Sequence, residues 1–157
     1  MDYCSVAPGL YHGGACDAGI AALPMPLGII TMNVGEVDEG LINHGMGIDF
    51  VLSVWIEDRP DAVLSDSAYL ALLDTCLALK KSGYNLYVHC AAGISRSSYL
   101  TLGILMATQN INYSMALMTL RKKRAFVMPN AGFEAHLKKL ESQIRSRNNG
   151  TVPNPNP

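Results

Sequence analysis

The sequence predicts a single α/β domain in which a central, mostly parallel, twisted sheet is flanked by helices. Short apolar segments with strand character alternate with longer segments whose apolar residues recur at helical spacing. One strand leads directly into a glycine-containing loop and then a helix, as is common in parallel sheets. The chain has 157 residues, which is most simply one domain and is enough to bury a sizeable core.

The first half of the chain contains three candidate strands and one candidate helix. Apolar and β-branched residues predict the strands at residues 10–12, 29–33 and 50–56. A brief helix is expected over 17–23, where the prolines that follow stop it. Residues 35–47 are polar and interrupted by glycines, so we expect them to form a connection.

The second half is mostly helical. Apolar residues at helical spacing predict four helices, at residues 65–81, 97–108, 113–121 and 131–145. A strand is expected over 85–89, between the first two helices, and Asn112 is a candidate cap of the third. The tail over 148–157 is rich in Asn and Pro and is expected to be disordered, which leaves 1–147 as the folded domain.

The run from His89 to Ser97 reads His-Cys-Ala-Ala-Gly-Ile-Ser-Arg-Ser and connects a predicted strand to a predicted helix. Such a sharp turn leaves backbone N–H groups without partners, and these donors together with the helix dipole form a site for an anion. Arg96 adds a planar fork that can hold two phosphate oxygens. The expected phosphate-binding residues are the small or flexible ones before it: Ala91, Ala92, Gly93, Ile94 and Ser95.

Cys90 lies inside this positive field and is predicted to be the nucleophile. A cysteine near a helix N-terminus and an arginine reaches a pKa of roughly 3.5–7.5, against about 8.5 for a free cysteine. We expect Ser97 to donate a hydrogen bond to the sulfur and His89 to support the loop without carrying protons. The alternative, a buried structural cysteine beside an incidental arginine, does not account for the complete run.

This run resembles the active-site loop of cysteine-dependent protein phosphatases, and His-Cys-x-Ala-Gly-x-Ser-Arg-Ser is most similar to the dual-specificity class. Residues 7–14 resemble the family's opening strand, 28–34 its first central strand, and 121–133 its closing helix–loop–helix. The resemblance implies hydrolysis of phosphomonoesters through a phosphocysteine, with no metal and no other cofactor. It also implies that Arg124 lies near the pocket as a secondary phosphate contact.

The leaving group of a phosphate ester needs a proton, so a carboxylic acid is expected on a nearby loop. The segment after the strand over 50–56 offers three acidic residues. In the resembling family the general acid follows such a strand at about the distance that separates Asp58 from Cys90, which is 32 positions. We therefore predict Asp58 as the acid, with Asp61 as the second candidate and Glu57 as the third.

Charge is unevenly distributed along the chain. Residues 1–75 contain eleven acidic residues and one basic residue, whereas residues 76–157 contain eleven basic and two acidic residues. The basic half contains the predicted anion site, which favours attraction of phosphorylated substrates. No basic surface interleaved with aromatic residues is evident, so no nucleic acid partner is expected. No apolar run has the length of a membrane span and no secretory signal is evident, so a cytoplasmic location is expected, with the nucleus also open.

The four cysteines do not have the spacing of a metal site or of a dense disulfide framework: Cys4, Cys16, Cys76 and Cys90. A catalytic thiolate also points to a reducing compartment. One alternative is that Cys76 pairs reversibly with an oxidised Cys90 and protects it, and the other is that Cys76 belongs to the core.

The expected substrates are phosphorylated proteins. The loop contains no lysine, which weakens a phosphoinositide interpretation, and no insertion is evident that would build a deep cleft. A shallow pocket would accept phosphotyrosine as well as phosphoserine and phosphothreonine. Three alternatives remain open: the same chemistry on an RNA 5′-phosphate, a phospholipid or a phosphoglucan; a phosphoprotein-binding module with weak catalysis; and sulfur or arsenate chemistry. The sequence does not predict the oligomeric state.

Overall fold

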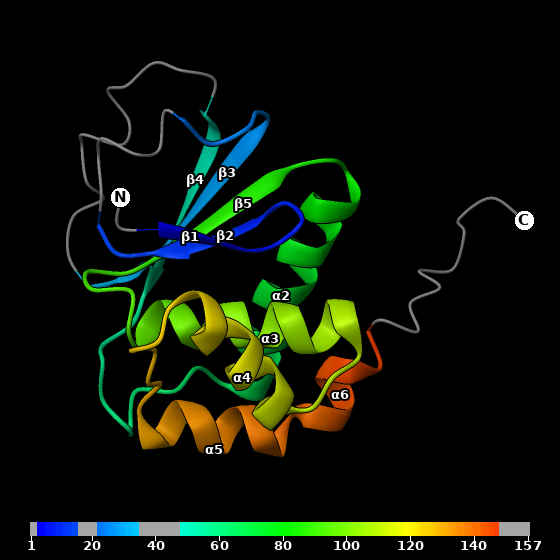
Figure 1. Ribbon diagram of the computed structural model, residues 1–157. Coiled ribbons are helices and arrows are strands. Elements are labelled where there is room, and N and C mark those ends of the chain that lie inside the picture. The colour runs from blue at the N-terminus through cyan, green and yellow to red at the C-terminus, as the bar shows by residue number, and fades with distance from the viewer. Residues whose placement is uncertain (1–2, 16–21, 35–47, 148–157) are drawn as a thin grey trace, which may run out of the picture.

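Five strands form one sheet in the order β1-β2-β5-β3-β4 (Figure 1). This computed structural model describes residues 3–15, 22–34 and 48–147. The strands are β1 (Tyr3–Ala7), β2 (Leu10–Gly13), β3 (Leu27–Asn33), β4 (Ile48–Trp55) and β5 (Asn85–His89). The β1–β2 pair is antiparallel, whereas β2–β5, β3–β5 and β3–β4 are parallel. The mostly parallel sheet predicted from the sequence is therefore confirmed.

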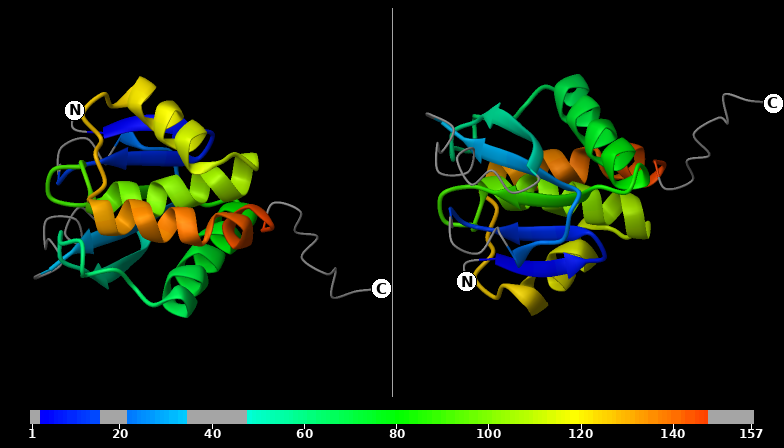
Figure 2. Two further views of the ribbon diagram at one scale, coloured as in Figure 1. Left: turned by 90° about the horizontal axis from the view of Figure 1, so that it is seen from below. Right: turned by 90° about the horizontal axis from the view of Figure 1, so that it is seen from above.

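The described helices all lie on one face of this sheet, as the views from below and above show (Figure 2). They are α2 (Asp66–Lys81), α3 (Arg96–Gln109), α4 (Tyr113–Lys123), α5 (Ala131–Lys139) and α6 (Glu141–Arg145). Side chains of Ser65, Asn112 and Asn130 cap α2, α4 and α5 by accepting a hydrogen bond from a backbone N–H in the first turn. None of these described helices has both the length and the hydrophobicity needed to cross a membrane.

Two elements differ from the sequence-based expectation. Strand β1 was not expected, and it forms a hairpin with β2 through a turn in which Gly9 has φ +66°. The single helix expected over 131–145 is two helices, because Leu140 ends α5 and begins α6 with φ −88° and ψ 2°. The expected helix over 17–23, except for its last two residues, the connection over 35–47 and the tail over 148–157 lie outside the described residues.

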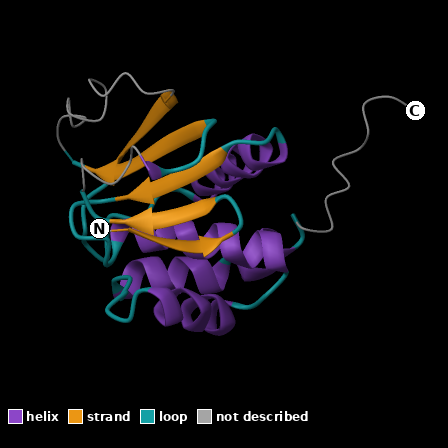
Figure 3. Cartoon of the chain, turned by 45° about the horizontal axis from the view of Figure 1, so that its top comes forward, coloured by secondary structure: helices purple, strands orange, loops and turns teal. Residues whose placement is uncertain are grey.

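Helix α3 is the centre of the helical layer, and Figure 3 shows how the strands and helices form two layers. Residues 97–107 of α3 are all buried, because the helix packs against the sheet on one side and against its neighbouring helices on the others. A second, smaller cluster covers the opposite face of the sheet and contains Leu27, Ile29 and Tyr87. The N-terminus of α3 is thereby fixed at the carboxyl end of β5, where parallel sheets place their ligand sites.

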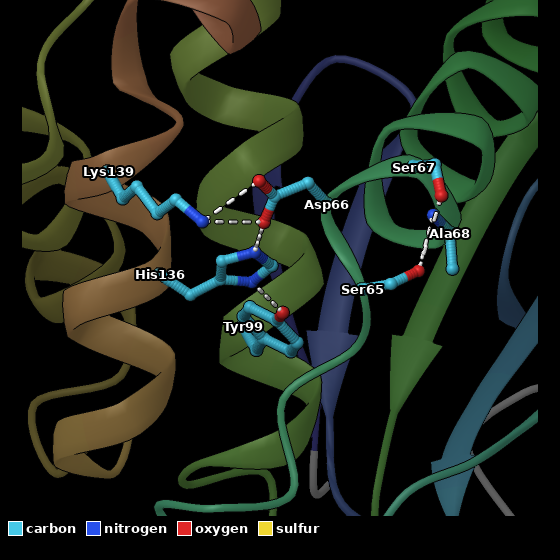
Figure 4. A network of polar contacts seen from close by, with 7 residues as sticks. All are labelled: Ser65, Asp66, Ser67, Ala68, Tyr99, His136 and Lys139. Atoms are coloured by element: carbon cyan, nitrogen blue, oxygen red, sulfur yellow. Dashed lines mark hydrogen bonds and ion pairs between the residues drawn. The ribbon is translucent and has the colours of Figure 1, made fainter.

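A polar network joins three of the helices (Figure 4). The imidazole of His136 on α5 donates through Nε2 to Asp66 Oδ1 at 2.8 Å, and its Nδ1 accepts from the hydroxyl of Tyr99 on α3. Lys139 Nζ donates to both carboxylate oxygens of Asp66, at 2.9 and 3.1 Å. These contacts tie the first turn of α2 to α3 and to α5.

Candidate active site

The loop over residues 90–95 connects β5 to α3 and packs against the end of β2. The N–H of Cys90 donates to the carbonyl of Gly13 at 3.4 Å, and the N–H of Ala15 donates to the carbonyl of Ala91 at 3.0 Å. Gly93 has φ +66°, and a Cβ atom placed on it would lie 2.6 Å from the carbonyl carbon of Gly13. A glycine is therefore required here for both conformation and space.

The sulfur of Cys90 is buried and accepts hydrogen bonds from this loop. The Ser97 hydroxyl lies 3.2 Å from Sγ, and the backbone N–H of Gly93 donates to Sγ at 3.3 Å. Burial raises the pKa of Cys90, but hydrogen bonds with the Ser97 hydroxyl and with the backbone of Ser97, Gly93 and Ile94 lower it by more, so the net pKa is below that of an ordinary thiol. The thiolate is thus favoured, chiefly through hydrogen bonds.

Arg96 is the first residue of α3, and its guanidinium is oriented from the neighbouring strand. Its Nη1 donates to Asn33 Oδ1, at the end of β3, at 2.5 Å. Its Nε is buried and has no hydrogen-bond partner within the described parts of the chain. Buried donors are nearly always satisfied, so this N–H fits an oxygen of a bound phosphate. The sequence pattern did not identify Asn33, although a polar residue at the carboxyl end of a parallel strand is a signal for such a role.

Two buried histidines, His12 and His89, lie on the strands next to the loop. His89 Nε2 forms a hydrogen bond with Thr31 Oγ1 at 2.8 Å, and its ring stacks on Tyr87 with centroids 5.1 Å apart. His12 accepts from the Thr101 hydroxyl at 2.9 Å and donates to the carbonyl of Gly93 at 3.1 Å. These His89 contacts join the end of β5 to β3, and its predicted role in supporting the loop stays a prediction. The sequence did not mark His12 as a loop contact.

Arg124 contacts the same loop through its backbone carbonyls. The side chain is 8% exposed, and it donates from Nε to Gly93 O at 3.0 Å and from Nη2 to Ala92 O at 2.9 Å. The guanidinium also lies over the ring of Phe126, 4.5 Å from its centroid. These contacts make Arg124 a positioning residue for the loop, and a contact with the phosphate itself stays a prediction.

Among the three acidic candidates, Asp58 is the one in contact with the loop over residues 90–95, the candidate phosphate loop. Its Oδ1 accepts from the Ser95 hydroxyl at 2.6 Å and from Asn130 Nδ2 at 2.9 Å. Asp61 and Glu57 instead pair with Arg59, at 2.8 and 2.9 Å. The hydrogen bond from Arg59 holds the pKa of the exposed Asp61 carboxyl below its usual value.

Asn130 joins three segments at this edge of the sheet. Besides its bond to Asp58, its N–H donates to the Ser95 hydroxyl at 3.0 Å and its Oδ1 accepts from the N–H of Phe133 at 3.0 Å, which caps α5. Two residues further on, a Cβ atom on Gly132 would lie 1.9 Å from the carbonyl oxygen of Pro60. The start of α5 therefore packs directly on the backbone of the loop that contains Asp58, a contact that the sequence did not predict.

The described cysteines Cys4, Cys76 and Cys90 are free thiols. Cys76 is fully buried in α2, and burial raises the pKa of its thiol to about 12. This environment disfavours the redox role considered for Cys76 and agrees with a core position. Across residues 3–15, 22–34 and 48–147, His, Cys, Asp and Glu side chains nowhere gather in a group of three or more suited to a metal ion.

The fold and the loop together define an α/β protein in which a loop with a cysteine and an arginine joins a parallel strand to the N-terminus of a helix. The profile described as dual specificity phosphatase, catalytic domain, matches residues 30–143. The human dual specificity protein phosphatase 1 is 32% identical over 139 residues, which cover 88% of this chain and 37% of that protein. The MAP kinase phosphatase with leucine-rich repeats protein 3 of Dictyostelium discoideum is 31% identical over 143 residues, covering 88% of this chain and 16% of that protein.

The chain belongs to the dual-specificity phosphatase family, which confirms the family expected from the loop. It spans little more than a third of the length of human dual specificity protein phosphatase 1, with 37% of that protein covered.

Solved structures agree on the fold. Human DUSP28 superposes with a TM-score of 0.73 at 23% identity, covering 92% of this chain and 96% of that one. PTPMT1 in complex with PI(5)P superposes with a TM-score of 0.77 at 19% identity, covering 94% and 99%.

Proposed function

We propose that this chain removes phosphate from phosphotyrosine and from phosphoserine and phosphothreonine in proteins, through a phosphocysteine intermediate on Cys90. The observation that carries the proposal is the buried Cys90 sulfur, whose pKa is lowered by hydrogen bonds. The unpaired Nε of Arg96 and the Asp58 carboxyl on the neighbouring loop support the same chemistry.

The proposed reaction has two steps. The Cys90 thiolate attacks phosphorus while the loop N–H groups and Arg96 hold the non-bridging oxygens, and Asp58 gives its proton to the departing alcohol or phenol oxygen. Asp58 then takes a proton from water as that water attacks the phosphocysteine, which releases inorganic phosphate and the thiolate. The Ser97 hydroxyl, 3.2 Å from the sulfur, stabilises the thiolate as it leaves.

A protein substrate fits this site better than a highly charged phospholipid. Residues 91–95 contain no basic side chain, and the pocket beside the loop is lined by the acidic Asp58 and by neutral residues. The structural relative solved with PI(5)P is 19% identical, so its similarity carries the fold and no substrate. A binding module without catalysis is disfavoured, because the nucleophile, the arginine and an acid are all in place.

The free thiols also bear on location. A mechanism that depends on the Cys90 thiolate, in a chain whose described cysteines are unpaired, fits a reducing compartment such as the cytoplasm or the nucleus.

A trapping experiment tests the proposed function. The protein is mixed with p-nitrophenyl phosphate or a phosphotyrosine peptide and quenched in acid after a single turnover. We expect a covalent phosphate on Cys90 by mass spectrometry, turnover of both substrates, competitive inhibition by vanadate and insensitivity to chelators. Cys90→Ser should lose turnover and keep substrate binding. Turnover that persists in Cys90→Ser, or that stops with a chelator, would contradict the proposal.

A further inference from the structure

A pocket of about 420 Å³ opens beside the phosphate loop, on the side of Asp58. Its polar lining consists of Asp58, Ser95 and Asn130. Its apolar lining consists of Ile94, Met128, Pro129 and Ala131. The pocket therefore adjoins the point at which a leaving group meets the proposed acid.

The polar part of this lining is largely engaged by its own hydrogen bonds. Asp58 Oδ1 accepts from Ser95 and from Asn130, and the Ser95 hydroxyl also accepts from the Asn130 N–H. These bonds occupy Asp58 Oδ1 and the Ser95 hydroxyl, and the other carboxyl oxygen of Asp58 is left for the leaving group. The described lining contains no basic side chain, so a second phosphate or a carboxylate would lose water there without gaining a charge partner.

The apolar part of the lining ranges from the exposed Met128 to the buried Pro129, and backbone hydrogen bonds hold it in place. The Met128 side chain is 65% exposed, yet its backbone N–H donates to the carbonyl of Ile94 at 3.0 Å. The preceding Val127 is buried, and its carbonyl accepts from Arg121 Nε at 2.9 Å. The backbone of Met128 is thus fixed relative to the phosphate loop. Its flexible side chain can still adapt its shape to varied apolar partners.

We propose that this pocket binds an apolar side chain, such as leucine or methionine, that lies next to the phosphorylated residue in a substrate protein. The inference rests on the proposed function, because Asp58 must reach the leaving oxygen and so brings the neighbouring substrate residues to the mouth of this pocket. Met128 is then a specificity-determining residue, and acidic neighbours are selected against.

Phosphopeptides test the preference in the unaltered protein. Each peptide carries one phosphotyrosine in a Gly/Ser background, with Leu or Asp placed singly at each of the two positions on either side. We expect kcat/KM to be about tenfold higher for Leu than for Asp at one of these positions at least. The value for p-nitrophenyl phosphate serves as the reference, because that molecule has no flanking residue.

A positive charge introduced into the pocket lining at position 128 tests whether Met128 determines the substrate preference. In Met128→Lys, the ratio of kcat/KM for the Leu peptide to that for p-nitrophenyl phosphate should fall about tenfold, and the Asp peptide should gain. The matched control is Met118→Lys, which adds the same charge at a 60% exposed methionine on α4, outside the pocket lining, and should keep the ratio. Thermal unfolding of both variants shows whether each is folded.

Three results would overturn the inference. These are equal kcat/KM for Leu and Asp at all four positions, identical behaviour of the two lysine variants, and a Met128-dependent preference for phosphoinositide vesicles over every peptide. Peptide binding to Cys90→Ser, measured by fluorescence polarisation, gives the same comparison without turnover. Absence of hydrolysis of p-nitrophenyl phosphate and of all peptides by the unaltered protein would instead contradict the proposed function.

Discussion

The pKa of Cys90 depends on two opposing effects, burial and hydrogen bonding. Cys90 is only 3% exposed, and a cysteine so deeply buried would ordinarily remain a neutral thiol, because a low-dielectric environment penalises the charged form. The Ser97 hydroxyl and backbone N–H groups of the loop reverse this by bonding to the thiolate. In the proposed reaction the loop would provide hydrogen bonds for two charged species in turn, first the thiolate and then the phosphate.

Removal of the Ser97 hydroxyl should raise the pKa of Cys90. In Ser97→Ala the desolvation of the sulfur remains while one stabilising bond is lost, so the thiolate forms at higher pH than in the unaltered protein. The rate of alkylation by iodoacetamide, measured against pH, should shift its rising limb toward higher pH. Ser114→Ala, at an exposed position on α4, is the control. An unchanged or acid-shifted limb in Ser97→Ala would refute this account of the pKa.

Replacement of Asp58 should affect substrates according to their leaving groups. For a phosphothreonine peptide, whose alkoxide leaves poorly, Asp58→Ala should lower kcat about 100-fold or more. For p-nitrophenyl phosphate the loss should be much smaller, because nitrophenolate departs without a proton. Steady-state kinetics of both substrates check this, with Asp61→Ala as the control, since Asp61 pairs with Arg59. If Asp61→Ala shows the leaving-group dependence instead, the assignment of the acid is wrong.

Single residues differ in how far the sequence alone reveals them. Cys90, Arg96 and Ser97 stand close together in one run, so their type and spacing already indicate the chemistry. Asn33 and His12 reach the same loop from β3 and β2, and nothing local in the sequence connects them to it. Contacts of this kind arise from the sheet order, which places β5 between β2 and β3.

Among the secondary-structure elements, the start of α5 fixes the position of the loop that contains Asp58. The close approach of Gly132 to Pro60 leaves no room for a side chain, and Asn130 bonds to Asp58 and to Ser95 at the same point. The position of Asp58, the proposed acid, thus depends on a helix that contributes no reacting group to the proposed reaction.

A comparison of two asparagine caps, Asn112 and Asn130, can separate the contribution of Asn130 to helix stability from its role in positioning Asp58. Asn112 and Asn130 each accept a bond from the first turn of a helix, at 2.9 and 3.0 Å, so replacement of either by alanine should cost about 1 kcal/mol of stability. Asn130→Ala should also lower kcat for a phosphothreonine peptide while that for p-nitrophenyl phosphate changes less. Urea unfolding and kinetics of both variants make the comparison. Equal kinetic effects in the two variants would remove the positioning role.

The sequence predicts elements better than it predicts their ends. Three helices and one strand agree closely with the structure: those over 65–81, 97–108 and 113–121, and the strand over 85–89. Apolar residues mark each of them, at helical spacing in α2 and α4 and throughout the largely buried α3 and β5. The break at Leu140 has no glycine or proline to mark it. Leu140 is itself fully buried and continues the apolar pattern, so the periodicity extends across a change in helix direction.

For the molecule as a whole, the helical layer is held together by polar contacts as well as by its apolar core. The His136 imidazole lies between Asp66 and Tyr99 (Figure 4). The Tyr99 ring also stacks on Phe133, with the ring centroids 4.3 Å apart. Tyr99 stands one turn after Arg96. The network therefore links the packing of α2 and α5 to the helix that begins with Arg96, the proposed phosphate ligand.

Loss of His136 should destabilise the whole fold. His136→Ala leaves a cavity and deprives the buried Tyr99 hydroxyl of the acceptor for its proton, which together should cost about 2–4 kcal/mol of unfolding free energy. Lys138→Ala on the same helix removes an exposed ion pair with Glu134 and should cost less than about 1 kcal/mol. Urea denaturation followed by circular dichroism measures both. Because α2, α3 and α5 share the network, the unfolding transition of His136→Ala should stay cooperative and move to a lower urea concentration. If the two variants lost similar amounts of unfolding free energy, the network would add no more stability than a surface ion pair.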